Sequence, residues 1–335
     1  MYNLLKLSNQ EFNTIILNTA SKKGMSAAIV EKDFWVCVTL DYLFHHSRWK
    51  KHFAFKGGTC LSKVYHLIER FSEDIDLIID WRILGYGINE PWEQRSNTKQ
   101  QKFIDDSKER LFFFLQNDFL SEFKTGMSNL LGFEINAYID KSDLGSVLFA
   151  YPSSFNDSSI IKVIKIEAGI LSSWMPLNKG IVRPFIAEEY PNIVSYSEIE
   201  LLATTPERTF WEKITILHQE AFRPDSSLVP LRYSRHYYDV YCMCQKGIKE
   251  TALKNPKMLE DAALFKMKFY PRNWARFDLA KIGSIKLFPS SHSVDRLRKD
   301  YNDMKSMIYG NYPSFDEILE TIKSLQEEIN KANVI

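Results

Sequence analysis

The spacing of hydrophobic residues predicts helices in the first part of the chain. Apolar residues recur every three or four positions over residues 9–21 and 26–46, and Phe34, Val38 and Tyr42 keep this spacing in the second segment. Such spacing places apolar side chains along one face of a helix, which can then pack on a core. We therefore expect two N-terminal helices.

A different pattern begins at residue 52. The short apolar run 52–55 ends at Gly57-Gly58, and Thr59 opens a segment with helical spacing. Residues 72–80 first alternate between polar and apolar and then become apolar throughout, which is typical of a strand. This stretch therefore predicts a strand, a glycine turn, a short helix and a second strand.

The remainder divides into a strand-rich and a helical region. The predicted elements are a polar loop at 89–101, a helix at 102–125, strands at 131–139, 145–151 and 160–168, and a turn-rich stretch at 172–200. From Thr204 the pattern is helical, and Thr205-Pro206 is typical of an N-cap followed by proline. We expect a first domain at 1–200 with a small mixed sheet and a helical domain at 201–335, an α/β fold followed by an α lobe.

Composition narrows the class of protein. Of 335 residues, 45% are hydrophobic and 25% are charged, which is ordinary for a globular chain. No stretch of 18 uncharged apolar residues is present, and the N-terminus lacks the apolar region of a secretory signal, so we expect no membrane association. Four cysteines are too few for a disulfide framework, so we expect a cytoplasmic protein.

The net charge of +1 conceals an asymmetry. Residues 231–310 contain 16 Lys and Arg against 8 Asp and Glu, a net charge of +8, and the rest of the chain carries −7. A basic region of this kind either contacts a polyanion or is a solvated helical surface. Within it, residues 269–277 interleave aromatic and basic side chains, a composition that suits unpaired RNA bases and equally suits packing.

The candidate chemistry lies between residues 57 and 76. If residues 72–76 are extended, Ser72, Asp74 and Asp76 share one face, because successive side chains of a strand alternate. Two neighbouring carboxylates repel each other, and oxygen ligands of this kind suit Mg²⁺ or Mn²⁺. Gly57-Gly58 before a helix lets backbone N–H groups approach an anion. A carboxylate pair that binds metal beside a turn that binds phosphate is what nucleotidyl transfer requires.

These motifs resemble those of a known family. The run Gly-Gly-Thr-x-Leu-Ser from Gly57, followed by Arg-x-Ser-x-Asp-Ile-Asp-Leu from Arg70, is similar to the AbiEii/AbiGii family of nucleotidyltransferase toxins. This MenT-like family belongs to the polymerase-β-like nucleotidyltransferase superfamily. Segments 31–35, 206–213 and 234–241 extend the resemblance, which covers the chain from about residue 26 to residue 331. It implies a polymerase-β-like core followed by a helical lobe.

The resemblance also implies roles for individual residues. Asp74 and Asp76 are expected to hold the metal ions, and a neighbouring strand normally supplies a third carboxylate, for which Glu167 is the candidate. Further catalytic roles are implied for Ser72, Lys213 and Asp239, and nucleotide binding for Gly57, Gly58, Thr59, Arg70, Ser72 and Lys213.

Three charged residues near the carboxylates have an ordinary structural role as the alternative to a role in the site. Glu167 can be the cross-strand ion-pair partner of a lysine. Arg70 can neutralise phosphate or pair with Glu69 or Glu73. Lys63, one turn into its helix, is expected to lie in solvent.

Two residues of the helical region have alternatives as well. Lys213 lies at the border of the apolar stripe on its helix, where a lysine either extends into solvent or reaches into a cleft. Asp239 stands four residues after Arg235, the spacing of a surface ion pair on a helix.

The expected function is transfer of a nucleoside monophosphate from a nucleoside triphosphate (NTP) to an acceptor. The resemblance implies a toxin of a bacterial toxin–antitoxin or abortive-infection (phage-defence) system, with tRNA as acceptor and a cognate antitoxin as partner. Two alternatives stay open: a small-molecule or protein acceptor, and a catalytically silent binding protein of the same fold.

Overall fold

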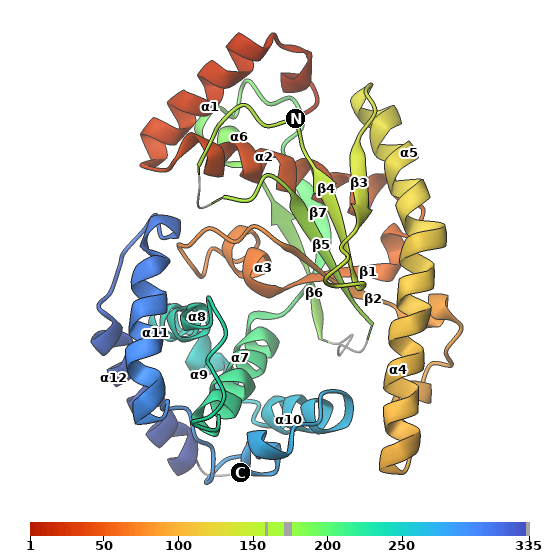
Figure 1. The fold of residues 1–335 in the computed structure, drawn as a ribbon. Coiled ribbons are helices and arrows are strands. Elements are labelled where there is room, and N and C mark those ends of the chain that lie inside the picture. The colour runs from red at the N-terminus through yellow and green to blue at the C-terminus, as the bar shows by residue number, and fades with distance from the viewer. Residues whose placement is uncertain (158–159, 171–175, 333–335) are drawn as a thin grey trace. The chain divides into compact units, whose positions relative to one another are not determined.

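The computed structural model describes residues 1–157, 160–170 and 176–332, and the chain forms two compact units (Figure 1). The first unit consists of Met1–Tyr65 and Phe71–Thr204, and the second of His66–Arg70 and Thr205–Ile335. The short segment His66–Arg70 therefore belongs to the second unit, although both of its flanks belong to the first.

A mixed seven-stranded sheet forms the centre of the first unit. Its strand order is β3–β4–β5–β2–β1–β7–β6. Parallel pairing joins β2 to β5 and β1 to β7, and the other neighbours are antiparallel. The strands are β1 (Phe53–Lys56), β2 (Ile75–Ile79), β3 (Asn136–Ile139), β4 (Ser146–Ala150), β5 (Ile164–Gly169), β6 (Leu177–Val182) and β7 (Ile199–Thr204).

Helices cover this sheet. Helix α2 packs on β5 and β7 and is itself covered by α1 and α6, while α5 packs beside β3 (Figure 1). Helices α4 and α5 are joined through a π-helical turn, and a second π-helical turn extends α2. The helices are α1 (Asn9–Lys23), α2 (Ala27–Asp41), α3 (Gly57–Lys63), α4 (Asn97–Phe114), α5 (Leu120–Leu131) and α6 (Phe185–Glu189), and the π turns are Tyr42–His46 and Leu115–Phe119. Short 3₁₀ turns lie at Leu4–Lys6, Lys50–His52, Trp81–Leu84 and Glu90–Trp92.

The second unit is helical in its described residues. Helix α7 packs against α8, α9 and α10, and α8 also contacts α11 and α12. Segment His66–Arg70 joins this unit through its backbone, because the Tyr309 N–H donates to the Glu69 carbonyl at 3.0 Å. The helices are α7 (Pro206–Ala221), α8 (Ser234–Gln245), α9 (Ile248–Leu253), α10 (Lys257–Phe269), α11 (Ser291–Asp303) and α12 (Phe315–Lys331), with 3₁₀ turns at Asn273–Ala275, Phe277–Leu279 and Lys305–Met307.

The predicted fold class, a mixed sheet followed by helices, is confirmed. The predicted helix cap is also present, since the Thr205 side chain accepts from the Arg208 N–H and Pro206 opens α7. None of the helices among the described residues combines the length and the apolar character needed to cross a membrane.

Several boundaries differ from the prediction. The helix predicted at 102–125 begins earlier and, with its π turn, extends from Asn97 to Leu131, so the predicted loop and strand beside it are shorter. The stretch predicted as turns contains α6, the strand β6 and the start of β7, while residues 171–175 lie outside the described part. Strand β6 is an edge strand with Asn178, Lys179 and Gly180 at its centre, and these residues lack the apolar alternation that identifies a strand.

Candidate active site

The glycine turn between β1 and α3 lies directly against Asp76. Gly57 has a φ of 81°, which side chains rarely adopt, and a Cβ there would be 1.9 Å from Oδ2 of Asp76. The Thr59 hydroxyl donates to the backbone carbonyl of Asp74 at 2.5 Å. Only glycine fits at position 57, because the turn and the carboxylate segment are in contact.

Exposure alternates along the carboxylate segment. Ser72, Asp74 and Asp76 are partly exposed, whereas Glu73 and Ile75 between them are buried. Strand β2 begins only at Ile75, so the residues before it lie outside the strand ladder. The alternation agrees with the expectation that the serine and the two aspartates share one face.

Glu167 lies on the strand next to the carboxylates. It is the register partner of Asp76, because β2 and β5 pair in parallel. Its Oε2 is 3.5 Å from Nζ of Lys165, and that Nζ is 2.8 Å from Oδ2 of Asp143. Burial opposes the charge on Lys165, but Asp143, Glu167 and Asp74 outweigh it and raise the pKa of this lysine. A lysine partner for Glu167 therefore exists, on its own strand rather than across strands.

The donor chemistry of these carboxylates suits Mg²⁺ or Mn²⁺, since it consists of oxygen ligands from adjacent positions. In the part of the chain that the structure describes, no three Asp, Glu, His or Cys side chains are grouped so as to hold a metal ion. Lys56 is the register partner of Asp76 on the side opposite Glu167. The carboxylates therefore supply the type of ligand that a divalent metal needs. Lys56 and Lys165 are the positive side chains at neighbouring positions.

A second group of predicted residues forms an ion-pair cluster within the second unit. Asp239 on α8 accepts hydrogen bonds from Nε of Arg70 at 2.7 Å and from Nη2 at 2.9 Å. Nζ of Lys213 on α7 is 2.7 Å from Oδ2 of the same carboxylate. These side chains are at most 8% exposed, so two cations and one anion are buried together.

The fold shifts the pKa values of the three groups in this cluster in different directions. Burial alone would raise the pKa of Asp239, but Arg70 and Lys213 outweigh it and hold this pKa well below its usual range. Burial lowers the pKa of Lys213, and Arg70 adds to this by repulsion. For Arg70, attraction to Asp239 overcomes burial and raises the pKa. Burial, with repulsion from Lys213, lowers the pKa of His236 well below its usual value.

The structure changes the interpretation of several charged residues. Arg70 pairs with Asp239, which is 169 positions away and was not among its expected partners. The prediction that Lys63 lies in solvent is wrong: this lysine is buried, and its Nζ is 2.7 Å from Oδ1 of Asp33. Lys213 is buried as well, rather than extending into solvent.

The aromatic and basic segment 269–277 is largely packed. Phe269, Ala275 and Phe277 are buried, which favours the packing alternative. Tyr270 remains 46% exposed, and the guanidinium of Arg272 lies 5.7 Å from the ring centre of Trp274.

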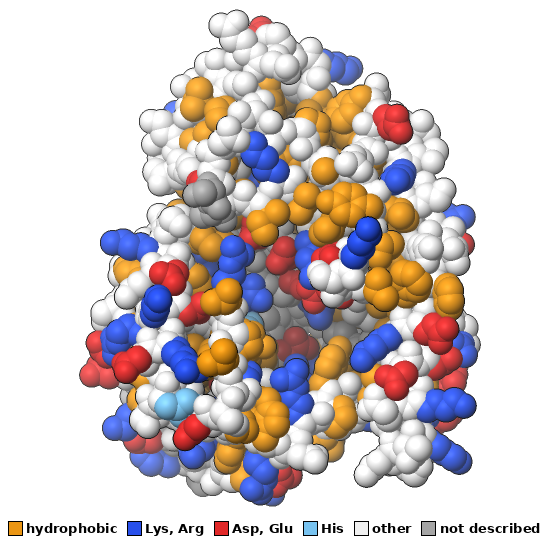
Figure 2. All heavy atoms as spheres, in the orientation of Figure 1, with side chains coloured by type: hydrophobic (Ala, Val, Ile, Leu, Met, Phe, Trp, Pro, Cys, Tyr) orange, Lys and Arg blue, Asp and Glu red, His pale blue; other side chains and the backbone are white. Residues whose placement is uncertain are grey.

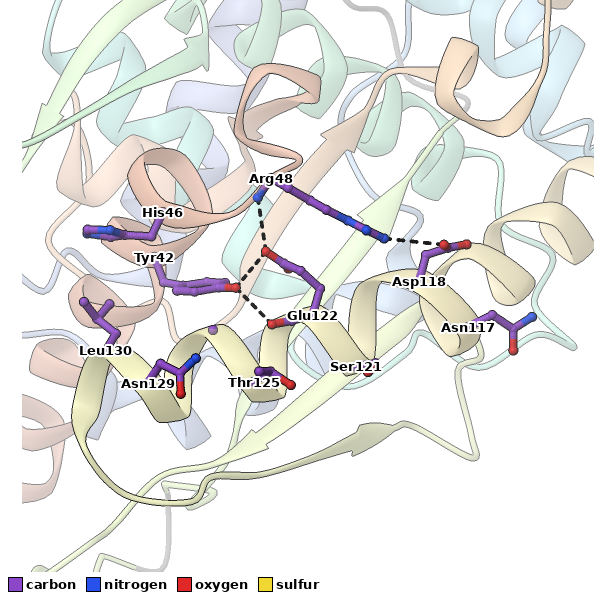
Figure 3. Close-up of a pocket in the computed structure, with 11 residues that line it drawn as sticks. Tyr42, His46, Arg48, Asn117, Asp118, Ser121, Glu122, Thr125, Asn129 and Leu130 are labelled. Atoms are coloured by element: carbon purple, nitrogen blue, oxygen red, sulfur yellow. Dashed lines mark hydrogen bonds and ion pairs between the residues drawn. The ribbon is translucent and has the colours of Figure 1, made fainter.

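An open pocket of about 880 Å³ lies elsewhere in the first unit, along α5 and the two π-helical turns (Figure 3). At its wall, the Glu122 carboxylate accepts from the Tyr42 hydroxyl at 2.8 Å and from the Arg48 backbone N–H at 3.1 Å. Arg48 also reaches Asp118 at 3.5 Å. None of the predicted site residues lines this pocket, so we do not assign the reaction to it.

Sequence comparison identifies the class of protein that this fold and these motifs define. A family model described as the nucleotidyl transferase AbiEii toxin of type IV toxin–antitoxin systems matches residues 41–321, and the chain belongs to this family. The predicted resemblance is thereby confirmed.

Among solved structures, the chain is similar to MenT4, a nucleotidyltransferase toxin from Mycobacterium tuberculosis H37Rv. The two are 12% identical, with a TM-score of 0.41 over 95% of this chain and 99% of that one. A comparison with curated protein sequences gave no match.

Proposed function

We propose that this AbiEii-family nucleotidyltransferase uses Mg²⁺ or Mn²⁺ to transfer a nucleoside monophosphate from an NTP to tRNA. The observation that supports this most directly is the approach of Gly57 to Asp76, where a Cβ would be 1.9 Å from the carboxylate. A triphosphate held by residues 57–59 and a metal held by this carboxylate would then be neighbours. Family membership supplies the reaction class.

In the proposed reaction, an acceptor hydroxyl oxygen forms a bond to the α-phosphorus, and the bond from that phosphorus to the β-phosphate oxygen breaks. Pyrophosphate leaves, and the hydroxyl proton passes to a carboxylate or to water. Asp74, Asp76 and Glu167 would hold the metal, and the bound ion would supply positive charge beside the phosphate and acceptor oxygens. Ser72 would donate to a phosphate oxygen from the same face.

Lys213 is proposed to supply a positive charge to the triphosphate. The pKa of Lys213 is lowered although Asp239 already contacts its ammonium group, so the fold disfavours this charge. A second anion such as the triphosphate would stabilise it. Arg70 and Asp239 would orient this lysine, because Asp239 is held by two hydrogen bonds from the guanidinium. Arg70 also stands two residues before Ser72 in the chain.

The choice of tRNA as acceptor comes from the family resemblance, and the charge of the chain is compatible with an RNA acceptor. Residues 231–310 carry a net charge of +8, and Figure 2 shows Lys and Arg side chains interspersed with Asp and Glu on the face in view. If RNA is the acceptor, its affinity should fall steeply with salt, because each phosphate contact releases counterions. A small-molecule acceptor would show little dependence of this kind, and a catalytically silent protein would bind NTP without turnover.

The test is incubation of the purified chain with total RNA, Mg²⁺ and each labelled NTP in turn, with Asp76→Asn as control. A labelled band in the size range of tRNA is expected with the wild type alone. Label on a protein or on a small molecule would show that the acceptor is that molecule and not tRNA. Label in no fraction, with any of the four nucleotides, would refute the proposed reaction.

Family membership supports a proposal for the biological role. We propose that the chain acts in the cytoplasm as the toxin of a phage-defence system, and that a cognate antitoxin opposes it. Induction of the wild-type chain without the antitoxin should arrest growth, and Asp76→Asn should not. Arrest by both variants would separate toxicity from nucleotidyl transfer.

A further inference from the structure

Helix α2 carries three consecutive charged residues in buried surroundings. Every residue from Ala28 to Asp41 is buried, including Glu31, Lys32 and Asp33. A charge that is removed from water is costly unless a partner of opposite charge and hydrogen bonds compensate it. The partners of these residues therefore show which parts of the fold the helix holds.

Lys32 holds the carboxylate segment. Its Nζ lies 2.6 Å from Oε2 of Glu73 and donates to the Ile161 carbonyl at 2.7 Å. The two ion-paired side chains are 1% and 6% exposed. Glu73 stands between Ser72 and Asp74, so the lysine contacts this segment from its buried face, behind the catalytic candidates.

The next residue, Asp33, contacts the end of the helix that follows the glycine turn. Oδ1 of Asp33 is 2.7 Å from Nζ of Lys63, and its Oδ2 accepts from the Phe185 N–H at 2.7 Å. Lys63 is the last residue of α3, whose first residue is Gly57. Neighbouring residues of α2 thus hold both motifs of the proposed site, the carboxylate segment and the helix that follows the turn.

Residues 71–74 precede the strand, so contacts outside the sheet ladder hold them, among them the Thr59 hydroxyl on the Asp74 carbonyl and the ion pair of Glu73. The ladder of β2 begins at Ile75 with β5 and at Asp76 with β1. Backbone pairing in the sheet therefore orients Asp76, whereas Ser72 and Asp74 lie before the paired region. A buried ion pair at Glu73 orients this stretch by its side chain.

We propose that Lys32 is a positioning residue for nucleotidyl transfer, which sets the place of Ser72 and Asp74 through its ion pair with Glu73. This inference rests on the proposed function. Stability alone does not account for the pair, since replacing a buried ion pair by apolar side chains of similar volume is often neutral or stabilising. Position does account for it, because a displacement of about 1 Å at reacting groups can lower a rate about 10²-fold.

The test is the double variant Lys32→Met/Glu73→Leu, which removes both charges and keeps the apolar volume. The matched control is Glu220→Leu/Arg223→Met, another buried pair with a 2.6 Å contact, in the second unit. We expect kcat to fall about 10²-fold in the first variant, with KM for NTP within about twofold. Hydrogen exchange should accelerate in residues 71–79 of that variant alone.

Each result bears on the proposal. Unchanged exchange in residues 71–79, or faster exchange with unchanged kcat, would overturn it. If the wild type shows no transfer, the proposed function fails, and the positioning role is then tested by calorimetric measurement of Mn²⁺ affinity in place of kcat. A tenfold or greater loss of affinity in the Lys32→Met/Glu73→Leu variant would support the positioning role. Equal affinity in the variant and the wild type would overturn it. Should the double variant not fold, Glu73→Gln, which keeps the side-chain length, is measured in the same three ways.

Discussion

Replacement of Lys213 by methionine separates the charge of this side chain from its packing. Methionine keeps most of the apolar stem and removes the ammonium group. Lys213 is 6% exposed, and its Nζ lies 2.7 Å from Oδ2 of Asp239. Asp239 keeps its two hydrogen bonds from Arg70 in the variant, so no carboxylate is left without a partner.

Two opposing contributions set the effect on stability. Loss of a charge-assisted hydrogen bond costs about 1.5–3 kcal/mol. Removal of a buried ammonium relieves a desolvation penalty of several kcal/mol and its repulsion from Arg70. The lowered pKa of Lys213 indicates that the second contribution is larger, because the fold disfavours the charged form. We therefore expect Lys213→Met to unfold at the same or a higher urea concentration than the wild type.

Activity should change in the opposite direction. If the ammonium stabilises charge on the triphosphate, its loss should lower kcat by 10²–10³, or ~3–4 kcal/mol. Lys213→Arg should recover only part of this, since a planar fork does not replace a compact charge.

The assays are steady-state transfer of labelled nucleotide and urea unfolding, with Lys249→Met as control. Lys249 lies on α9, forms an ion pair with Glu328 at 2.8 Å and has no proposed role in the reaction. Wild-type turnover by Lys213→Met would remove this lysine from the site. A loss of more than about 2 kcal/mol in unfolding free energy would show that the assumed balance of desolvation and pairing is wrong.

Further predictions concern the carboxylates, the turn and pH. Asp74→Asn or Asp76→Asn should abolish transfer yet leave the melting temperature without metal equal or higher, because repulsion is relieved; thermal melting and transfer assays check this. Gly57→Ala should lower both stability and Mn²⁺ affinity in calorimetry, since its Cβ would collide with Asp76. Asp239→Asn should cost about 3–5 kcal/mol in urea unfolding, because two buried cations lose their carboxylate. As pH rises from the lowered pKa of Lys213 towards 10.5, the wild type should gain stability that Lys213→Met lacks, because the folded lysine releases its proton first.

Local pattern was sufficient for the carboxylate segment. The alternation of residues 72–76 predicted which side chains face the same way, and exposure alternates accordingly. The cap at Thr205-Pro206 was readable for the same reason, since its hydrogen bond joins residues three positions apart. Both features depend on geometry that repeats within a few residues.

Partners distant in sequence could not be read in this way. Arg70 and Asp239 are 169 positions apart, and Lys32 and Glu73 are 41 apart. Charged residues at 31–33 within an apolar helical segment were a signal of burial, but they do not indicate which opposite charges they meet. The edge strand β6 was missed because its central residues are polar, and its pairing with β7 defines it.

The sequence by itself determined the family and the fold class, and it supplied the carboxylate and glycine motifs on which the proposed site rests, because motif spacing and side-chain period are local properties of the chain. Tertiary structure decided that Lys213 and Lys63 are buried rather than solvated, and that Asp239 is shared by two cations. It also placed Glu167 beside Asp76, through the parallel register of β2 and β5. Burial and pairing depend on which distant segments pack together, and packing sets both the desolvation and the partner of each charge.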